Sequence, residues 1–182
     1  MSNSSKRFVI LILVGVLAAG FVFASKSSIS VQASPFAYQK VRFDNDWNYS
    51  SSFGFGAKVS YKYNPSESFA MGLSSSILDF KILGDRYLVF SITGEIGVIA
   101  EITETIDLYF DMGLGADYRV YRGLKQFYPA YSLGFGSDYY VAEPLAFTFG
   151  AELRFCQQEN EIPEFSSTDY NLVYYVGLKA KL

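Results

Sequence analysis

Hydrophobic and polar residues alternate along the chain with a period of two from about residue 34 onward. In 53–63 the odd positions are apolar or aromatic, while the even positions are Gly, Ser and Lys. The segment 106–120 repeats this in the other parity, and 145–155 and 172–182 show the same contrast. Because successive strand side chains point to opposite faces, the pattern predicts β-strands with one apolar and one polar face.

Turn-forming residues divide this region into eight predicted strands. Short turns rich in Asn, Pro, Ser, Thr and Glu lie at 64–67, 103–105 and 142–144. Longer connections are expected at the opposite strand ends, at 44–50, 83–86, 122–127 and 156–169. The predicted strands span about 35–43, 51–63, 68–82, 87–101, 106–121, 128–141, 145–155 and 170–182. This organisation predicts an all-β, eight-stranded antiparallel up-and-down barrel over residues 34–182.

The two faces of these strands favour a membrane barrel. A soluble barrel turns its second face to water and carries many charges there, whereas this face is mostly Gly and Ser with isolated charges. Aromatic residues also gather near strand ends, as in the girdles at a bilayer interface: Tyr61, Tyr63, Phe69, Tyr139, Tyr140 and Phe147. The sequence therefore predicts a transmembrane β-barrel, with a soluble periplasmic β-barrel as the alternative.

The first residues have the pattern of a secretory signal. Lys6 and Arg7 precede an uncharged apolar run from Phe8 to Ala24. Small residues end cleavage triplets at Ala24 and Ala33, so we interpret 1–33 as a signal peptide cleaved after one of these alanines. A retained membrane helix is the alternative, although the run is short against the roughly 20 residues that a helix needs to cross a bilayer.

Composition narrows the chemistry. A net charge of −3 is unlike that of a nucleic-acid-binding protein. The chain has no histidine, and no motif pairs a serine with another activating base, so no catalytic residues are predicted. No spacing indicates a metal or cofactor site either. We therefore expect a protein that is not an enzyme and that binds neither nucleic acid, metal nor cofactor.

Charged residues on the polar face are predicted to project into the lumen. Six are basic and seven acidic: Lys58, Lys62, Arg119, Arg154, Lys179, Lys181, Glu95, Glu101, Asp107, Asp111, Asp117, Asp138 and Glu152. An eight-stranded barrel leaves an interior just wide enough for side chains, and buried charges must pair. These residues predict a polar plug of ion pairs. The alternative is a narrow path that opens when the pairs rearrange.

The strand number, parity and turns resemble the small outer-membrane barrels of the OmpX-like and OmpA transmembrane-domain family. The last strand strengthens the resemblance, because Gly177 and the alternate residues Leu178, Ala180 and Leu182 fall where the C-terminal signal for the barrel-assembly machinery places them. Two departures are Leu182 in place of a final Phe, and Tyr175 in place of the polar residue that opens the signal. The resemblance implies an outer-membrane location, contact with outer-membrane lipid and both termini in the periplasm.

The resulting hypothesis is a structural or surface-interaction barrel of a Gram-negative-type envelope. Its long last loop is the expected contact with an external partner, through Glu159, Glu161, Ile162, Glu164 and Phe165; Asp169 is counted among the acidic residues of this loop. The alternative is a narrow channel for small or hydrophobic solutes, resembling the OmpW-like importers.

Overall fold

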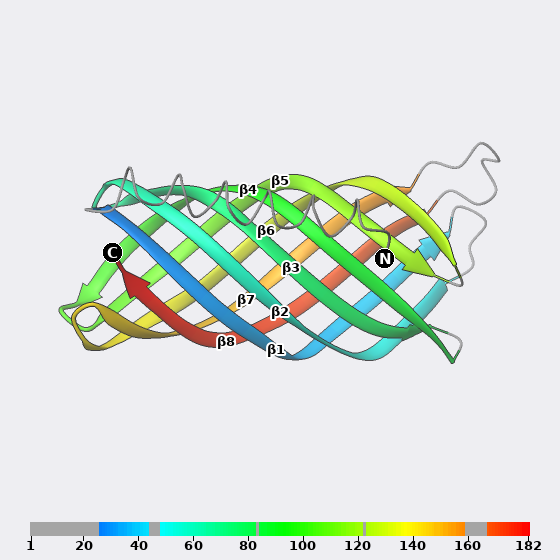
Figure 1. Ribbon diagram of the computed structural model, residues 1–182, viewed down its shortest axis with the longest axis horizontal. Helices are drawn as coiled ribbons and strands as arrows, with labels where there is room; N and C mark the ends of the chain where they lie inside the picture. The colour runs from blue at the N-terminus through cyan, green and yellow to red at the C-terminus, as the bar shows by residue number, and fades with distance from the viewer. Residues whose placement is uncertain (1–25, 44–47, 83, 122, 159–166) are drawn as a thin grey trace, which may run out of the picture.

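The computed structural model describes residues 26–43, 48–82, 84–121, 123–158 and 167–182, which form a closed barrel (Figure 1). Its eight strands are β1 (Ser27–Phe43), β2 (Asn48–Ser66), β3 (Phe69–Ile82), β4 (Asp85–Thr103), β5 (Ile106–Tyr121), β6 (Leu124–Ala142), β7 (Leu145–Gln158) and β8 (Ser167–Lys181). Each strand pairs antiparallel with the next, and β8 pairs with β1. The predicted up-and-down barrel is confirmed. No helix among the described residues is long and apolar enough to cross a membrane.

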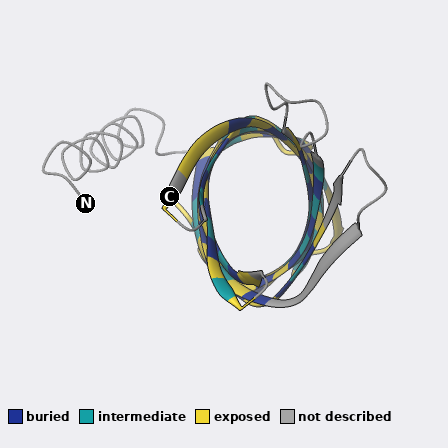
Figure 2. Cartoon of the chain, turned by 90° about the vertical axis from the view of Figure 1, so that its right-hand side faces the viewer, coloured by how far each residue is buried: buried dark blue, intermediate teal, exposed yellow. Residues whose placement is uncertain are grey.

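The apolar face of the strands points outward, as the alternation predicts. Leu114 and Phe135 on the outer wall are 63% and 62% exposed, whereas the inward-facing Ser91 and Asp117 are 2% and 0% exposed. Buried and exposed residues alternate along the described parts of the strands (Figure 2). Tyr140 is an exception to the predicted aromatic girdle. It lies at an even position of β6, faces inward and is only 9% exposed.

Strand β1 begins at Ser27, so the prediction that the first strand starts near residue 35 is wrong. A bulge explains the error. The register of β1 shifts against β2 between Ser34 and Ala37, and against β8 between Ala33 and Phe36. Pro35 lies at this bulge, where a residue without an N–H is tolerated. The shift moves the inward positions from even numbers to odd numbers, which hides the alternation in a sequence reading.

We call the end that carries the connections after β2, β4 and β6 the turn end, and the opposite end the loop end. The connections at the turn end are short, as predicted, and have two residues each. The two predicted loops at 83–86 and 122–127 are wrong, because β3 and β4, and also β5 and β6, are joined by only two residues. Only the links 44–47 and 159–166, which lie outside the described residues, are longer at the loop end.

Both tight hairpins at the loop end depend on a glycine with positive φ. Gly84 has φ of 86° and Gly123 has φ of 82°, a region that other residues rarely adopt. No atom lies within 4 Å of a Cβ built on Gly84. We expect Gly84→Ala to lower the free energy of unfolding by about 1 kcal/mol through its backbone alone. Urea titration of the refolded protein measures this. Gly94→Ala, whose Cβ has ordinary contacts, is the control and should cost clearly less.

The lumen also holds an apolar cluster that the alternation did not indicate. Its buried members come from β1, β3, β4 and β8: Ala37, Leu78, Phe80, Tyr87, Val89, Val173 and Tyr175. The ring of Phe80 packs directly over β2, because a Cβ on Gly54 would lie 2.4 Å from its Cδ1. Side chains of both kinds, apolar and charged, therefore fill the interior.

Candidate functional site

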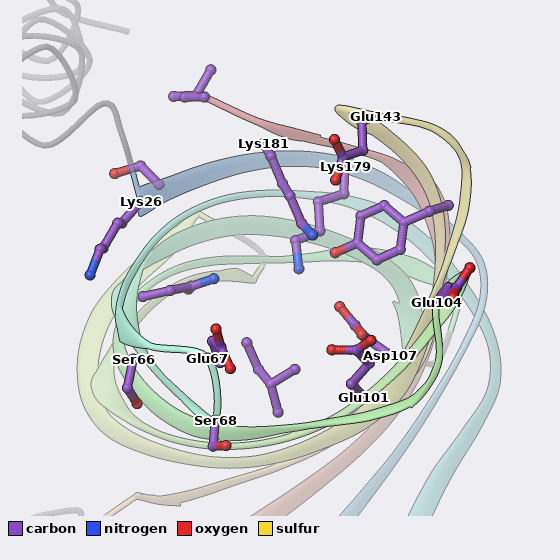
Figure 3. Close-up of a pocket in the computed structure, with 15 residues that line it drawn as sticks. Lys26, Ser66, Glu67, Ser68, Glu101, Glu104, Asp107, Glu143, Lys179 and Lys181 are labelled. Atoms are coloured by element: carbon purple, nitrogen blue, oxygen red, sulfur yellow. The ribbon is translucent and has the colours of Figure 1, made fainter.

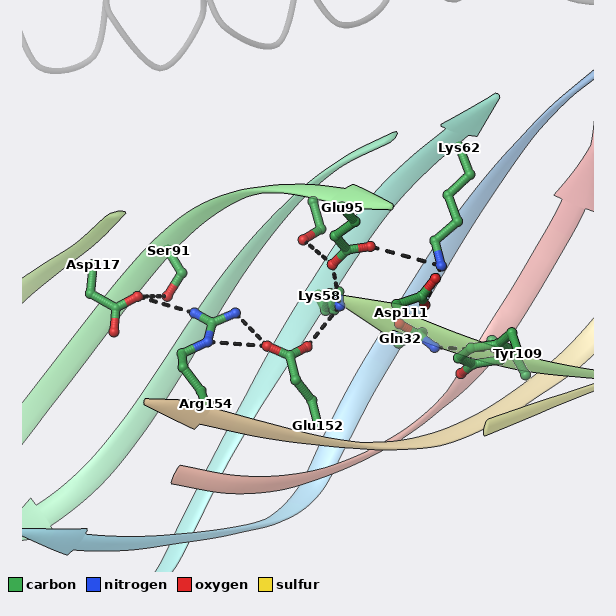
Figure 4. Close-up of polar contacts among 12 residues, drawn as sticks. Gln32, Lys58, Lys62, Ser91, Glu95, Tyr109, Asp111, Asp117, Glu152 and Arg154 are labelled. Atoms are coloured by element: carbon green, nitrogen blue, oxygen red, sulfur yellow. Dashed lines mark hydrogen bonds and ion pairs between the residues drawn. The ribbon is translucent and has the colours of Figure 1, made fainter. Parts of the chain in front are cut away.

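Charged side chains of alternating sign form a continuous chain through the lumen, and Figure 4 shows most of it. We call this chain the lumen ladder. Starting near the turn end, its members are Asp111, Lys62, Glu95, Lys58, Glu152, Arg154, Asp117, Arg119 and Asp169. It contains four cations and five anions, and each cation contacts two carboxylates.

The middle of the ladder has the closest charge pairs. The Lys58 Nζ lies 2.7 Å from Glu95 Oε1 and 2.7 Å from Glu152 Oε2. Arg154 Nη2 lies 2.6 Å from Glu152 Oε1, and its Nη1 lies 3.2 Å from Asp117 Oδ1. Arg154 is 1% exposed and Glu152 is 3% exposed. These groups are out of water, so each depends on its partners for the stability of its charged form.

The two ends of the ladder are held in the same way. Lys62 pairs with Asp111 and lies 3.8 Å from Glu95 Oε2. Arg119 Nη2 lies 3.1 Å from Asp117 Oδ2, and Arg119 also pairs with Asp169. The ladder thus runs without a break from residues near the turn end to residues near the loop end.

Several pairs connect strands that are not neighbours in the sheet. Lys58 on β2 reaches Glu152 on β7, and Arg119 on β5 reaches Asp169 on β8. Such pairs cross the lumen from wall to wall. Two small cavities beside Lys58 measure about 40 and 20 Å³, enough for only a few water molecules at roughly 10–15 Å³ each. Side chains therefore fill most of the lumen around Lys58.

Neutral groups add hydrogen bonds to the ladder. Ser74 Oγ donates to Glu95 Oε1 at 2.6 Å, and Ser91 Oγ donates to Asp117 Oδ1 at 2.7 Å. Arg119 Nη1 donates to the Tyr87 hydroxyl at 2.9 Å. The two serines donate to carboxylate oxygens and Tyr87 accepts a guanidinium N–H, so polar side chains of the wall add the further hydrogen bonds that buried ion pairs require.

Asp169 is a member of the ladder, although the sequence pattern predicts it among the acidic residues of the last loop. The structure places it on β8, where it is 0% exposed. The signal was present in the sequence. Odd positions of 172–182 face inward, and continuing this parity backward through Asn171 leads to Asp169.

The remaining predicted lumen charges lie nearer the turn end. Lys179 Nζ lies 2.6 Å from Asp138 Oδ2 and forms a separate pair. Glu101, Asp107 and Lys181 line a cavity of about 820 Å³ at the turn end, together with Lys26, Glu67, Glu104, Tyr140 and Glu143 (Figure 3). The structure thus brings eight of the thirteen predicted charges into the ladder, two into a pair, and three around this cavity.

The other predicted residues occupy different places. Leu178, Ala180 and Leu182 lie on the outward face at the end of β8, whereas Tyr175 faces the lumen and is 5% exposed. Their role as an assembly signal stays a prediction. Glu159, Glu161, Ile162, Glu164 and Phe165 lie outside the described residues. No group of three or more His, Cys, Asp and Glu side chains among the described residues is arranged to hold a metal ion.

Comparison with known proteins gives a fold and no sequence family. No family model matches the chain, and no curated protein matches it. Among solved structures, Neisserial surface protein A matches with a TM-score of 0.64 and 13% identity, over 86% of this chain and 97% of that one. This likeness confirms the fold that the sequence resemblance implies, that of a small outer-membrane barrel.

Two further structures are similar at a lower level. The attachment invasion locus protein Ail of Yersinia pestis has a TM-score of 0.48 and 14% identity, over 85% of this chain and 99% of that one. The outer membrane protease OmpT of Escherichia coli has a TM-score of 0.47 and 8% identity, over 87% and 97% of the two chains.

Proposed function

We propose that this chain is a non-catalytic outer-membrane barrel whose lumen is closed by paired charges and whose loop end faces the outside. The lumen ladder carries this proposal, since its cross-lumen pairs occupy the space that a solute needs. The outer wall supports the membrane location, because large apolar side chains such as Leu114 and Phe135 are exposed around it. A barrel with a closed lumen and no catalytic site can act as a structural component of the membrane, or bind partners at the cell surface.

The orientation follows from the connections. Bacterial barrels place short turns in the periplasm and longer loops outside. The three connections at the turn end have two residues each, and the longest link of the barrel, 159–166, is at the loop end. We therefore infer that both ends of the barrel chain, Ser27 and Leu182, lie on the periplasmic side, and that 159–166 is the contact with a surface partner.

Heat-modifiable gel mobility and single-channel conductance test this function together. We expect the protein to be extracted from outer membranes in a folded, fast-migrating form, and to give no steady conductance in planar bilayers. Recovery in the soluble periplasmic fraction contradicts the membrane location. Steady openings contradict the closed lumen and favour the narrow channel, for which the cavity of about 820 Å³ at the turn end would be the entrance.

The position of β1 makes a prediction about processing. Residues 27–33 pair with β2 and residues 28–33 also pair with β8, so cleavage after Ala33 would remove part of the barrel wall. We therefore expect the signal peptidase to cut after Ala24. The intact mass of the protein from outer membranes measures this, and we expect a mature chain beginning at Ser25. A chain beginning at Ser34 would contradict the pairing of residues 27–33.

A further inference from the structure

Charge on the outer wall is confined to one end of the barrel. Among the described strand residues that face outward, the charged ones lie only at the loop end: Lys40, Asp79, Lys81, Arg86 and Lys125. Four of these five are basic. Everywhere else on the described outer wall the outward positions are uncharged, as a surface in contact with hydrocarbon requires.

Three of the basic residues lie on one side of the barrel, on β3, β4 and β6. Lys81 is directly opposite Arg86 in the β3–β4 pairing, and Lys125 lies opposite Val120 of β5. All three side chains are exposed. We call Lys81, Arg86 and Lys125 the basic patch. Two acidic residues lie beside it: Asp79, whose Oδ2 lies 2.6 Å from Arg86 Nη2, and Asp85, which directly precedes Arg86 in β4.

An aromatic row lies directly on the membrane side of the basic patch. Phe90 on β4, Tyr118 on β5 and Phe127 on β6 are opposite one another in the sheet. The ring centroids of Phe90 and Tyr118 are 6.3 Å apart, and those of Tyr118 and Phe127 are 4.7 Å apart. Aromatic side chains on the outside of a barrel mark the level of the lipid headgroups.

The distances along the strands place the patch at the headgroups. Lys125 is two residues beyond Phe127, and Arg86 is four residues beyond Phe90, which corresponds to roughly 7 and 13 Å of strand. The strands are long enough for this, since β4 and β6 have 19 residues each and a tilted strand needs about 9–11 to cross a bilayer. Long Lys and Arg side chains at this level reach the phosphates while their stems lie on apolar surface.

We propose that the basic patch binds the phosphate of an anionic lipid headgroup in the leaflet at the loop end, with the lipid chains against the aromatic row. Arg86 supplies a planar guanidinium that matches phosphate oxygens, and the two lysines supply point charges on either side. When no lipid is bound, the ion pair with Asp79 holds the Arg86 side chain against the outer wall. The proposal rests on insertion of the barrel in a membrane and goes beyond its proposed structural role.

Lipid selectivity measured by electron spin resonance tests the proposal. The refolded mature protein is placed in phosphatidylcholine vesicles with a trace of chain-labelled phosphatidic acid or, separately, of chain-labelled phosphatidylcholine. We expect the protein to immobilise the phosphatidic acid label with at least about fivefold higher relative affinity. The triple variant Lys81→Gln, Arg86→Gln, Lys125→Gln should bring the two labels close to equal.

Lys40→Gln is the matched control, because Lys40 is also basic, outward-facing and at the loop end, but lies on β1 outside the patch. It should keep most of the preference. Equal affinities in the wild type, or an unchanged preference in the triple variant, overturn the proposal. If neither label is immobilised, the barrel does not insert into the membrane, and the membrane location is refuted. This outcome differs from loss of selectivity, in which both labels are immobilised equally.

The same experiment distinguishes binding of a lipid headgroup from binding of a free anion. Inorganic phosphate added at matched ionic strength should leave the preference unchanged if the site recognises a headgroup held in the bilayer. The lipid assignment would be overturned if the vesicles show no lipid preference and a soluble sulfated oligosaccharide binds the wild type but not the triple variant. The patch would then be a saccharide site.

Discussion

Replacing Arg154 with Met is expected to lower the free energy of unfolding by about 3–5 kcal/mol. Arg154 is 1% exposed and contacts both Glu152 and Asp117. Its loss leaves the ladder with five anions and three cations in a space closed to bulk water. Methionine keeps the apolar stem of the side chain and removes its guanidinium, so the effect reports mainly the lost charge and its hydrogen bonds. Urea unfolding of the refolded protein, followed by the heat-modifiable band, measures it.

Arg86→Met is the control for this prediction. The residue type and the substitution are the same, and Arg86 also forms an ion pair, with Asp79 at 2.6 Å. The Arg86 side chain is 66% exposed, however, so water compensates for the lost pair and the expected cost is below about 1 kcal/mol. Equal costs for the two variants would mean that the ladder does not hold the barrel together.

Truncating Phe80 to Ala is expected to cost about 3–5 kcal/mol of unfolding free energy. Phe80 is 0% exposed, although it sits in the lumen of a barrel that was predicted to be polar inside. Its ring covers Gly54 and lies 6.4 Å, between centroids, from the ring of Tyr87. Alanine would leave a cavity that the rigid wall does not close. The same urea titration measures the loss.

Phe127→Ala provides the comparison on the other side of the wall. Phe127 is 74% exposed on the outer surface, where lipid chains fill the space of a removed ring. What is lost is its contact with Tyr118, at 4.7 Å between centroids, for which about 1 kcal/mol is expected. A cost for Phe80→Ala no larger than this would show that the apolar cluster does not contribute to the stability of the lumen.

Most of the fold could be predicted from the alternation of side chains, since outward positions such as Leu114 and inward positions such as Asp117 differ in chemistry at every second residue. Strand β1 could not be located in this way. The bulge at Pro35 changes which residues face inward, and a sequence reading that assumes one parity per strand fails there. The two tight loop-end hairpins were missed because Gly84 and Gly123 shorten connections that look longer in sequence.

The sequence predicts which charged residues face the lumen, but it does not predict which of them pair with one another. Parity assigns Lys58, Glu152 and Arg154 to the lumen from sequence alone. Which cation reaches which carboxylate depends on the tilt and shear of the strands, and these follow from the closure of the whole barrel. The apolar cluster was missed for a related reason. Leu78 and Phe80 face inward on β3, whereas Asp79 and Lys81 beside them face outward. The usual contrast is therefore reversed near the loop end, and a reading that assigns the apolar face to the outer wall fails there.

The pairing of β8 with β1 has a consequence for how the protein is made. Every other pair of strands is a hairpin that forms locally, but this pairing joins residues such as Ser28 and Lys181, from opposite ends of the chain. Such long-range contacts form late and slowly. Until β8 has been exported, β1 presents an open hydrogen-bonding edge and the wall exposes its apolar face to water. The barrel can therefore close only when its last strand is present, and we expect the wall to form in a single late step.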